Sequence, residues 1–543
     1  MAFIDGLAAR FGFTVFAVLL GTFFFNLYRV RSHVRSLQKQ GLPMPPHSFL
    51  FGHLKFVASI VQEMPPNAHG VYIADQIRQR FPEMNTAFYL DIWPVGKPYL
   101  MAIHPDLLYQ LTQANQLPKD PGLQTFLKPL AGRQNLVTME GSAWKYWRSI
   151  FNPGFSASHI SSLVPGMVEK IEIFKKKMQE HANTGEMFFL EEMALNLTID
   201  IIGGAVMDHD FQSQSKYNDM TSALRNQLKW STTGIEINLL LKLNIFRPFV
   251  NMYNTWRMDR YLNPLFDNRY TTFQEKGTSP RKSVIDLALK AYLAENPSAQ
   301  SIPDAFKQVA IAQIKLFIFA GHDTTSSAVI FTYDLLYKHP TILARVRAEH
   351  TAVLGPNIPN ASALLTSKPH LLNHLPYTVA VIKEAFRIYP TVAALRIGQP
   401  DFSLVAPSGQ RFPTENCIVL GDHYGVHHNP SVWADAESFL PERWLVDETH
   451  ALYPPKNAWR PFEKGPRNCI GMELAMTEIK IILALTVRAF GIGDAYAEFD
   501  GSGRKGMKVN GMRTYMVRGT GGGHPADGYP CRVVLEGREE VEG

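Results

Sequence analysis

The chain has 543 residues, of which 46% are hydrophobic and 19% are charged, and its formal net charge is +6. This size supports a large buried core, and no repeat or long linker divides the chain. The modest charge, with no dense basic block carrying aromatics, argues against a nucleic-acid-binding protein. The chain has only three cysteines, Cys417, Cys469 and Cys531. This sparse usage argues against a disulfide framework and indicates a reducing compartment.

The first predicted element is an uncharged apolar run over residues 11–28, which Arg29, Arg31, Arg35 and Lys39 follow. A helix of this length just crosses a bilayer core. The basic residues on its C-terminal side place that side in the cytosol. A cleaved signal peptide is the alternative, but no small-residue cleavage site follows the run. The sequence therefore predicts an uncleaved anchor over residues 1–35 and one large cytosolic domain over residues 36–543.

Beyond the anchor, the pattern is mainly helical, with short strand pairs near both ends. Strands are predicted at residues 86–93 and 99–103, and helices at residues 166–180, 187–206, 302–338, 376–388 and 471–490. Near the C-terminus, a glycine-rich loop at residues 519–523 is expected to join strands 512–517 and 531–535. The predicted fold class is mainly α with small peripheral β-sheets.

A polar interruption divides the long apolar helical pattern of residues 311–337, at Ala320-Gly321-His322-Asp323-Thr324-Thr325. A carboxylate beside an alcohol in an apolar helix is costly unless it serves a purpose. Gly321 weakens the helix, and the Thr324 hydroxyl can bond to a preceding carbonyl and bend it. The pattern predicts a local opening of the helix in this segment. A kinked helix with a satisfied Asp323 is the alternative without chemistry.

Two pairs of residues, each one turn apart on a predicted helix, are candidates for contacts that stabilise the fold. Glu384 and Arg387 lie one turn apart, and Arg443 follows in a Pro-bounded loop. Such an acid–base pair by itself is usually a solvated helix face, but the order of helix, loop and cysteine favours a buried network. Trp144 and Arg148 also lie one turn apart and face one side of their helix.

The segment at residues 461–471 is the most informative, because a lone Cys469 lies between Gly465 and Gly471, after Arg467. A thiolate here suits a haem iron ligand. The two glycines lack a Cβ and allow the backbone to approach a flat ring. The helix after Gly471 would point its amides at the sulfur. A buried structural cysteine in a Gly/Pro loop is the alternative.

This segment resembles, at every fixed position, the haem-binding loop Phe-x-x-Gly-x-Arg-x-Cys-x-Gly of the cytochromes P450. The polar interruption is similar to that family's oxygen-binding motif. The two residue pairs and the loop of Arg443 resemble its Glu-x-x-Arg, Pro-Glu-Arg-Phe and Trp-x-x-x-Arg elements, with Trp444 in place of the usual Phe. The resemblance covers the chain from about residue 40 to the C-terminus. It implies the cytochrome P450 fold, preceded by a single transmembrane helix.

The resemblance also implies roles for individual residues. Cys469 would bind the iron of haem b, and the remaining cofactor contacts would come from Phe462, Gly465, Arg467, Gly471, Trp144, Arg148, Arg396 and Ala320. Thr324 would position a water beside bound O2, and Asp323 would relay protons to it. Glu384, Arg387 and Arg443 would form a buried triad that fixes the cysteine loop.

The implied function is a monooxygenase at the endoplasmic reticulum membrane. Two electrons from NADPH-cytochrome P450 reductase would activate O2, and one oxygen atom would enter a lipophilic small molecule. The sequence most resembles P450s of fungal secondary metabolism, including polyketide pathways such as that of sterigmatocystin. Two alternatives remain: an isomerase or dehydratase of the same fold that needs no O2, and a non-enzymatic haem protein that senses or carries a ligand.

Apolar and often small residues are expected to line the substrate pocket, which favours a hydrophobic substrate. They lie near Leu130, Leu240, Phe317, residues 392–395 and Tyr515. The amphipathic, basic segment at residues 235–250 is a candidate for contact with the membrane, although core packing explains it as well.

Overall fold

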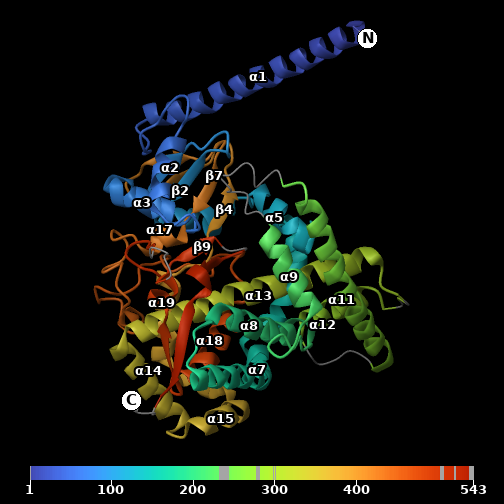
Figure 1. The fold of residues 1–543 in the computed structure, drawn as a ribbon, viewed down its shortest axis with the longest axis vertical. Coiled ribbons are helices and arrows are strands. Elements are labelled where there is room, and N and C mark those ends of the chain that lie inside the picture. The colour runs from blue at the N-terminus through green and yellow to red at the C-terminus, as the bar shows by residue number, and fades with distance from the viewer. Residues whose placement is uncertain are drawn as a thin grey trace.

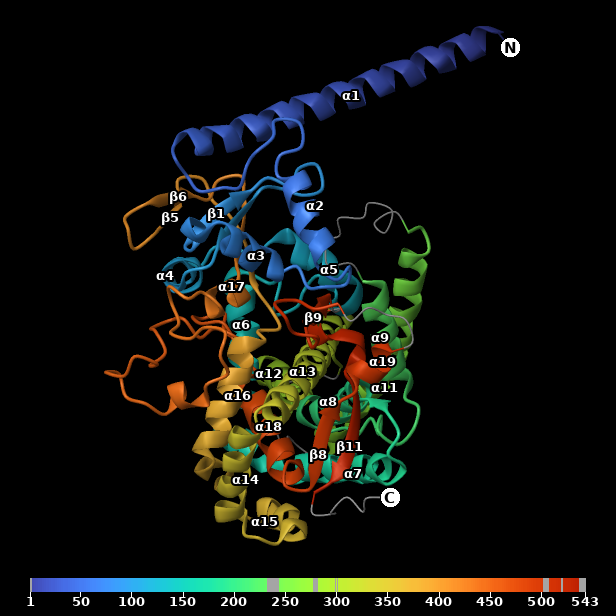
Figure 2. The ribbon, with the colours of Figure 1, turned by 60° about the vertical axis from the view of Figure 1, so that its left-hand side comes forward.

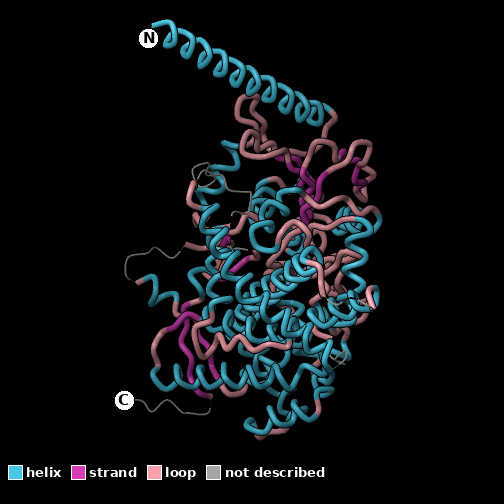
Figure 3. Tube along the Cα trace, turned by 90° about the vertical axis from the view of Figure 1, so that its right-hand side faces the viewer, coloured by secondary structure: helices cyan, strands magenta, loops and turns pink. Residues whose placement is uncertain are grey.

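The computed structural model describes residues 2–231, 244–276, 282–297, 299, 301–501, 507–518 and 521–536. Figures 1 and 3 show a mainly helical body with small groups of strands, and a long N-terminal helix that stands apart from it. This confirms the predicted fold class.

Helices make up most of the body. The longer helices are α1 Ala2–Lys39, α7 Ala157–Thr184, α8 Leu190–Met207, α11 Arg247–Lys276, α13 Asp304–Lys338, α14 Pro340–Leu354 and α18 Met472–Thr486. The shorter ones are α2 Leu54–Glu63, α3 Tyr72–Arg80, α4 Pro105–Tyr109, α5 Pro121–Ala131, α6 Gly141–Phe151, α9 Asp219–Trp230, α12 Val284–Glu295, α15 Ala361–Ser367, α16 Pro376–Ile388, α17 His423–His427 and α19 Tyr496–Asp500.

The described strands form four small sheets. The largest has the order β1-β2-β7-β4, with β1 Ala87–Leu90, β2 Tyr99–Ala102, β7 Ile418–Gly421 and β4 Ala394–Ile397. Its β2–β7 pair is parallel, and its other pairs are antiparallel. The other sheets are β3-β11-β8, β10-β9 and β5-β6, with β3 Phe188–Phe189, β11 Pro530–Leu535, β8 Phe490–Asp494, β10 Gly523–Pro525, β9 Met516–Arg518, β5 Ser403–Val405 and β6 Arg411–Pro413.

Helix α13 runs through the middle of the body (Figures 1 and 2). Most of its residues are buried, and its buried set includes polar side chains such as Gln313 as well as apolar ones, as expected for a helix inside a large core. It packs along α8, and Gly321 makes the close approach possible, since a Cβ there would lie 2.6 Å from Cδ1 of Ile202. Pro340 then begins α14 and ends α13 at Lys338.

The predicted helices and early strands are present, but two C-terminal boundaries differ. Helix α18 ends at Thr486, because the strand β8 begins at Phe490. The strand that follows the glycine-rich segment and pairs with β9 is β10, so the expectation that this segment joins strands 512–517 and 531–535 is wrong. Residues 531–535 belong to β11, which pairs with β8 and β3 instead.

Helix α1 is continuous from Ala2 to Lys39 and has two parts. Its apolar side chains from Phe11 to Phe25 are exposed, whereas Leu27, Val34 and Leu37 are buried against the body. It is the one helix of the described residues that is long and apolar enough to cross a membrane.

Arg31 is not a free flanking charge as the sequence suggested. It is fully buried, forms an ion pair with Asp91, and donates to the carbonyl oxygens of Phe49 and Trp93 at 3.1 and 2.8 Å. The base of α1 is therefore joined to the domain by a buried charge.

Candidate functional site

Cys469 lies in a tight loop that ends at the first turn of α18. Its N–H donates to the carbonyl of Phe462 at 2.8 Å, and the Phe462 ring packs against Phe386 with centroids 4.8 Å apart. Cys417 and Cys531 are buried, whereas Cys469 is exposed. Although Cys469 has accessible surface, the protein atoms packed around its sulfur keep water away and raise the pKa of the thiol, while the Gly471 N–H and the charge of Arg148 lower it. The amide at the start of the helix thus acts on the sulfur as predicted.

The two glycines of this loop have different constraints. Gly465 has φ +89°, and a Cβ on it would lie 2.6 Å from the carbonyl oxygen of Thr112. Only glycine fits there without a shift of the backbone. A Cβ on Gly471 would lie 3.9 Å from Sγ of Cys469, an ordinary contact. The protein alone therefore requires Gly465 but not Gly471.

Arg148 and Arg467 hold the loop rather than projecting free guanidinium groups. Arg148 donates to the backbone and side-chain oxygens of Asn468 at 2.9 and 3.0 Å. Arg467 pairs with Glu140 at 2.8 Å and lies 4.6 Å from the ring centroid of Trp144. Their predicted contact with haem propionates stays a prediction, and these contacts give both arginines a second task in shaping the loop.

Arg396 is the arginine with the fewest protein contacts at this site. It lies in β4, is 2% exposed, and its Nε has no hydrogen-bond partner among the described residues. Burial lowers its pKa to about 10. A buried guanidinium that lacks an anion is costly, so this position fits a carboxylate supplied from outside the chain.

Lys119 adds to this positive region, and the sequence analysis missed it. Its backbone bridges to that of Arg396. Burial, Arg396 and Arg467 lower the pKa of Lys119 to about 7. We call Lys119, Arg396 and Arg467 the cation cluster. Glu140 contacts this cluster, through Arg467 and the Lys119 N–H. The cluster therefore fits the two propionates of a haem.

The expected triad is assembled between α16 and the loop that contains Arg443. Glu384 pairs with Arg387 at 2.8 Å and with Arg443 at 2.9 Å, and all three side chains are fully buried. The indole N–H of Trp444 donates to Glu384 at 3.0 Å. Trp444 thus contributes a bond that the usual Phe lacks, and this replacement strengthens the network.

The polar interruption of α13 leaves an opening in an otherwise buried helix. Ala320 is exposed and Thr324 partly exposed, while their neighbours Phe319 and Asp323 are buried. The Thr324 hydroxyl donates to the carbonyl of Ala320 at 2.8 Å, as predicted. Helix α13 packs against α18, which begins just after Cys469. The exposed Ala320 and the exposed Cys469 thus belong to elements that pack against each other.

The pocket predictions have mixed outcomes. Phe317 belongs to the core, because its ring packs between those of Phe151 and Phe155, 5.3 and 5.2 Å away. Leu130 and Tyr515 are buried. Leu240, and with it much of the segment 235–250, lies outside the described residues.

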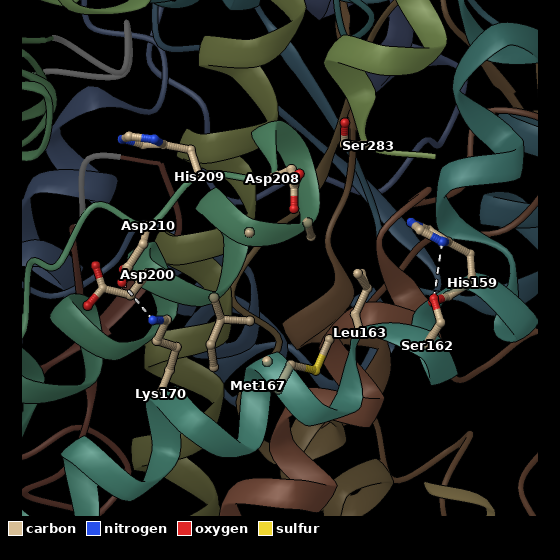
Figure 4. A pocket seen from close by; sticks show the side chains of 14 residues that line it. His159, Ser162, Leu163, Met167, Lys170, Asp200, Asp208, His209, Asp210 and Ser283 are labelled. Atoms are coloured by element: carbon tan, nitrogen blue, oxygen red, sulfur yellow. Dashed lines mark hydrogen bonds and ion pairs between the residues drawn. The ribbon is translucent and has the colours of Figure 1, made fainter. Parts of the chain in front are cut away.

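A separate hollow of about 520 Å³ with a mixed polar and apolar lining opens between α7, α8 and the start of α12 (Figure 4). Lys170 spans its mouth and pairs with Asp210 at 2.7 Å. His159, Asp208 and Ser283 also line it. Its lining shares no residue with the cysteine loop or the opening in α13, so it is a distinct surface feature.

The model of the family described as cytochrome P450 matches residues 44–494. The chain belongs to the cytochrome P450 family. It is 49% identical to cytochrome P450 monooxygenase polC of Polytolypa hystricis, over 97% of this chain and 95% of the relative. It is 35% identical to cytochrome P450 monooxygenase acrF of Aspergillus aculeatus, over 78% and 87% of the two chains.

Solved P450 structures share the fold. The haem domain of a cytochrome P450DA mutant aligns with a TM-score of 0.72 at 22% identity, over 92% of this chain and 98% of that domain. Enzymes of this family hold a haem through a cysteine thiolate. This P450 is therefore a haem-thiolate monooxygenase, and the O2-independent isomerase and the ligand carrier are not favoured.

Three residues that the sequence analysis did not select complete the surroundings of the site: Lys119, Glu191 and His524. Their partners lie hundreds of residues away along the chain, so no local spacing reveals them. The glycine-rich loop beside His524 was the available signal, because such a run permits close packing against another element.

Proposed function

We propose that this P450 oxidises a lipophilic small molecule in fungal secondary metabolism, of polyketide type, with Cys469 as the ligand of the haem b iron. The observation that carries the assignment is the exposed Cys469, with the Gly471 N–H acting on its sulfur. The two similar relatives are named monooxygenases and come from fungi, which supports the biological setting.

The chain's own residues would divide the work as follows. The bound haem supplies O2 activation, and the cation cluster, Trp144 and Arg148 would hold its edge. Ala320 leaves the space beside the ring. Thr324 would turn its hydroxyl from the Ala320 carbonyl to a water, and Asp323 would pass protons to that water. Substrate must enter an apolar cavity, which favours a lipophilic molecule.

We assign residues 1–35 to a single-pass anchor in the endoplasmic reticulum membrane and residues 36–543 to a cytosolic catalytic domain. Two apolar surfaces support this. One is the exposed part of α1, and the other is the apolar patch at the start of α11: Ile245, Phe246, Phe249, Met252 and Trp256. Figures 1 and 2 show that this start of α11 lies at the end of the body that carries α1. A cytosolic domain would take its electrons from NADPH-cytochrome P450 reductase.

The test uses microsomes that contain the full chain and NADPH-cytochrome P450 reductase. A panel of lipophilic polyketides is supplied with ¹⁸O2, and products are analysed by mass spectrometry. We expect a product that carries one ¹⁸O atom and requires NADPH, the reductase and Cys469. Microsomes with the Cys469→Ser variant are the matched control.

Two results would contradict the proposal. Conversion of an organic hydroperoxide without NADPH and O2 would indicate an isomerase or dehydratase. A haem that binds CO through a thiolate, but gives no oxidised product with any panel member and no NADPH oxidation, would indicate a ligand carrier.

A further inference from the structure

A histidine from the C-terminal hairpin connects the buried acid of α13 to an acid near the surface. Nε2 of His524 lies 3.0 Å from Oδ1 of Asp323, and Nδ1 lies 2.6 Å from Oε1 of Glu191. The side chains of Asp323, His524 and Glu191 are 2%, 10% and 21% exposed. These three residues form a polar line that leads from the interior at α13 toward solvent at the start of α8.

The hairpin is built to hold His524 in this place. The Gly522 N–H donates to the second carboxylate oxygen of Asp323 at 3.1 Å. A Cβ on Gly521 would lie 2.2 Å from the ring of Phe319, so only glycine lets the hairpin approach α13 this closely. The Oγ of Ser327 lies 3.4 Å from Nδ1 of His524. The contact between hairpin and helix thus rests on several fixed groups.

The electrostatics favour a charged imidazole between two carboxylates. Burial lowers the pKa of His524, but Asp323 on α13 and Glu191 on α8 outweigh it and raise the pKa to about 10. Burial in turn raises the pKa of Asp323, while His524 and the nearby His322 bring it below its usual value. On the hairpin, the residue opposite His524 is the apolar Val517 of β9. At neutral pH the line therefore holds an imidazolium and an ionised Asp323.

We propose that His524 and Glu191 are the residues through which Asp323 regains protons from solvent, an inference that rests on the proposed monooxygenase function. The imidazolium gives the proton on Nε2 to Oδ1 of Asp323. The side chain then swings away from Asp323, so that the bare Nε2 reaches solvent beside Glu191 while the proton on Nδ1 stays in place. Nε2 takes a proton there that the Glu191 carboxylate has picked up from water, and the ring returns to Asp323. One proton enters and one leaves, so the charge of the line is restored.

The experiment uses the holoenzyme with its reductase and compares His524→Gln, Glu191→Gln and Asp323→Asn. Glutamine keeps hydrogen-bonding groups but carries no exchangeable charge at neutral pH. The control is His209→Gln, because His209 also bonds a neighbouring side chain, Tyr261 at 2.9 Å, but lies outside the line. The NADPH oxidation rate is measured in H2O and D2O, and the reduced CO spectrum checks each variant.

We expect His524→Gln to slow NADPH oxidation by about 100-fold, the lower end of the range for a lost proton-transfer group. The solvent isotope effect should increase, and the CO spectrum should be unchanged. NADPH oxidation by the double variant of His524 and Asp323 should be no slower than by Asp323→Asn alone, because both changes block the same route of proton delivery. Glu191→Gln should give a smaller loss, since water can reach His524.

The pH profile separates proton delivery from a merely structural role. Without the imidazolium, burial raises the pKa of Asp323, so the His524→Gln profile should show a titration at higher pH than the unmodified enzyme does. A second readout needs no turnover. The His524 pair contributes stability fully below pH 6.5, and this is lost as pH rises through about 10. The difference in unfolding free energy between the unmodified chain and His524→Gln should shrink over that interval.

A His524→Gln holoenzyme with a normal CO spectrum, a normal NADPH oxidation rate and an unchanged pH profile would overturn the relay and leave the monooxygenase assignment intact. If the unmodified chain gave no thiolate-type CO spectrum, the proposed function itself would fail. The two failures are therefore distinguishable.

Discussion

The buried charges behind the cysteine loop depend on one carboxylate. Glu384 accepts hydrogen bonds from Arg387, Arg443 and Trp444, and also from the Leu440 N–H at 3.1 Å. Arg387 itself donates to the backbone carbonyls of His427, Ala436 and Ser438. The network ties α16 to the chain that leads to Cys469. Its loss would leave two buried guanidinium groups without their countercharge.

We predict that Glu384→Gln lowers the free energy of unfolding by about 3–5 kcal/mol, as when one partner of a buried ion pair is removed. Denaturant unfolding followed by circular dichroism measures this. The matched control is Glu498→Gln, because the Glu498–Arg532 pair has a similar 2.9 Å distance but is 51% and 47% exposed. The free energy of unfolding of Glu498→Gln should not change measurably. An equal loss in both variants would contradict the role of Glu384 in a buried network.

Residue types at the site were predictable from the sequence, but the partners of long side chains were not. The motif identified Cys469, and its helix-start amide lies where the pattern implied. Arg148 and Arg467 also donate to protein acceptors that the motif did not indicate, Asn468 and Glu140. A spacing rule fixes the side of a helix but not which acceptor a flexible guanidinium selects.

At the scale of elements, the tight approach of the cysteine loop to residues 110–114 sets a local requirement for glycine. We predict that Gly465→Ala destabilises the fold by about 1–3 kcal/mol, because alanine is strained at φ +89° and meets the Thr112 carbonyl. Gly471→Ala is the matched control from the same loop, with ordinary φ and an open Cβ position.

Thermal unfolding of both variants measures whether the protein itself needs glycine at each position. Their haem content measures whether the bound haem needs it. Gly465→Ala should lower the unfolding midpoint, whereas Gly471→Ala should keep it. A loss of haem from Gly471→Ala at unchanged stability would locate the ring against Gly471. Equal stability of both variants would show that the loop adapts to a Cβ at position 465.

The elements themselves were largely predictable, since the apolar periods of α7, α8, α13, α16 and α18 match the structure. The C-terminal hairpin was not, because β9 and β10 are short and β11 finds its partners far away in sequence. Hydrophobic pattern indicates that a strand exists, but pairing depends on which distant edge is open. The packing of Gly521 on Phe319 therefore appeared only in three dimensions.

At the scale of the whole molecule, two apolar surfaces at one end of the body indicate which end of the domain faces the membrane. The exposed part of α1 is suited to span a bilayer, and the apolar patch of α11 is suited to rest on it. The buried pair of Arg31 and Asp91 fixes the base of α1 on the domain.

We predict that deletion of residues 2–25 converts an integral membrane protein into a peripheral one, because the apolar patch of α11 is retained. Phe249→Ser with Trp256→Ser in the shortened chain should then release it to the soluble fraction. Alkaline extraction and flotation of membranes measure both steps. The control is Val534→Ser in the shortened chain, since Val534 is also exposed, at 61%, but on β11. Alkali-resistant binding of the shortened chain would contradict the role of α1.

The proposed chemistry requires Cys469 as the ligand of the haem iron, and the reduced CO difference spectrum of the full chain tests this ligand directly. The red-shifted Soret band of thiolate ligation should be present in the unmodified chain and in Cys417→Ala, whose thiol is buried and protonated, its pKa raised by burial to about 12. It should be absent from Cys469→Ser. A folded chain that shows no such band, or a Cys469→Ser variant that keeps it, would contradict the assignment of Cys469 and with it the proposed chemistry.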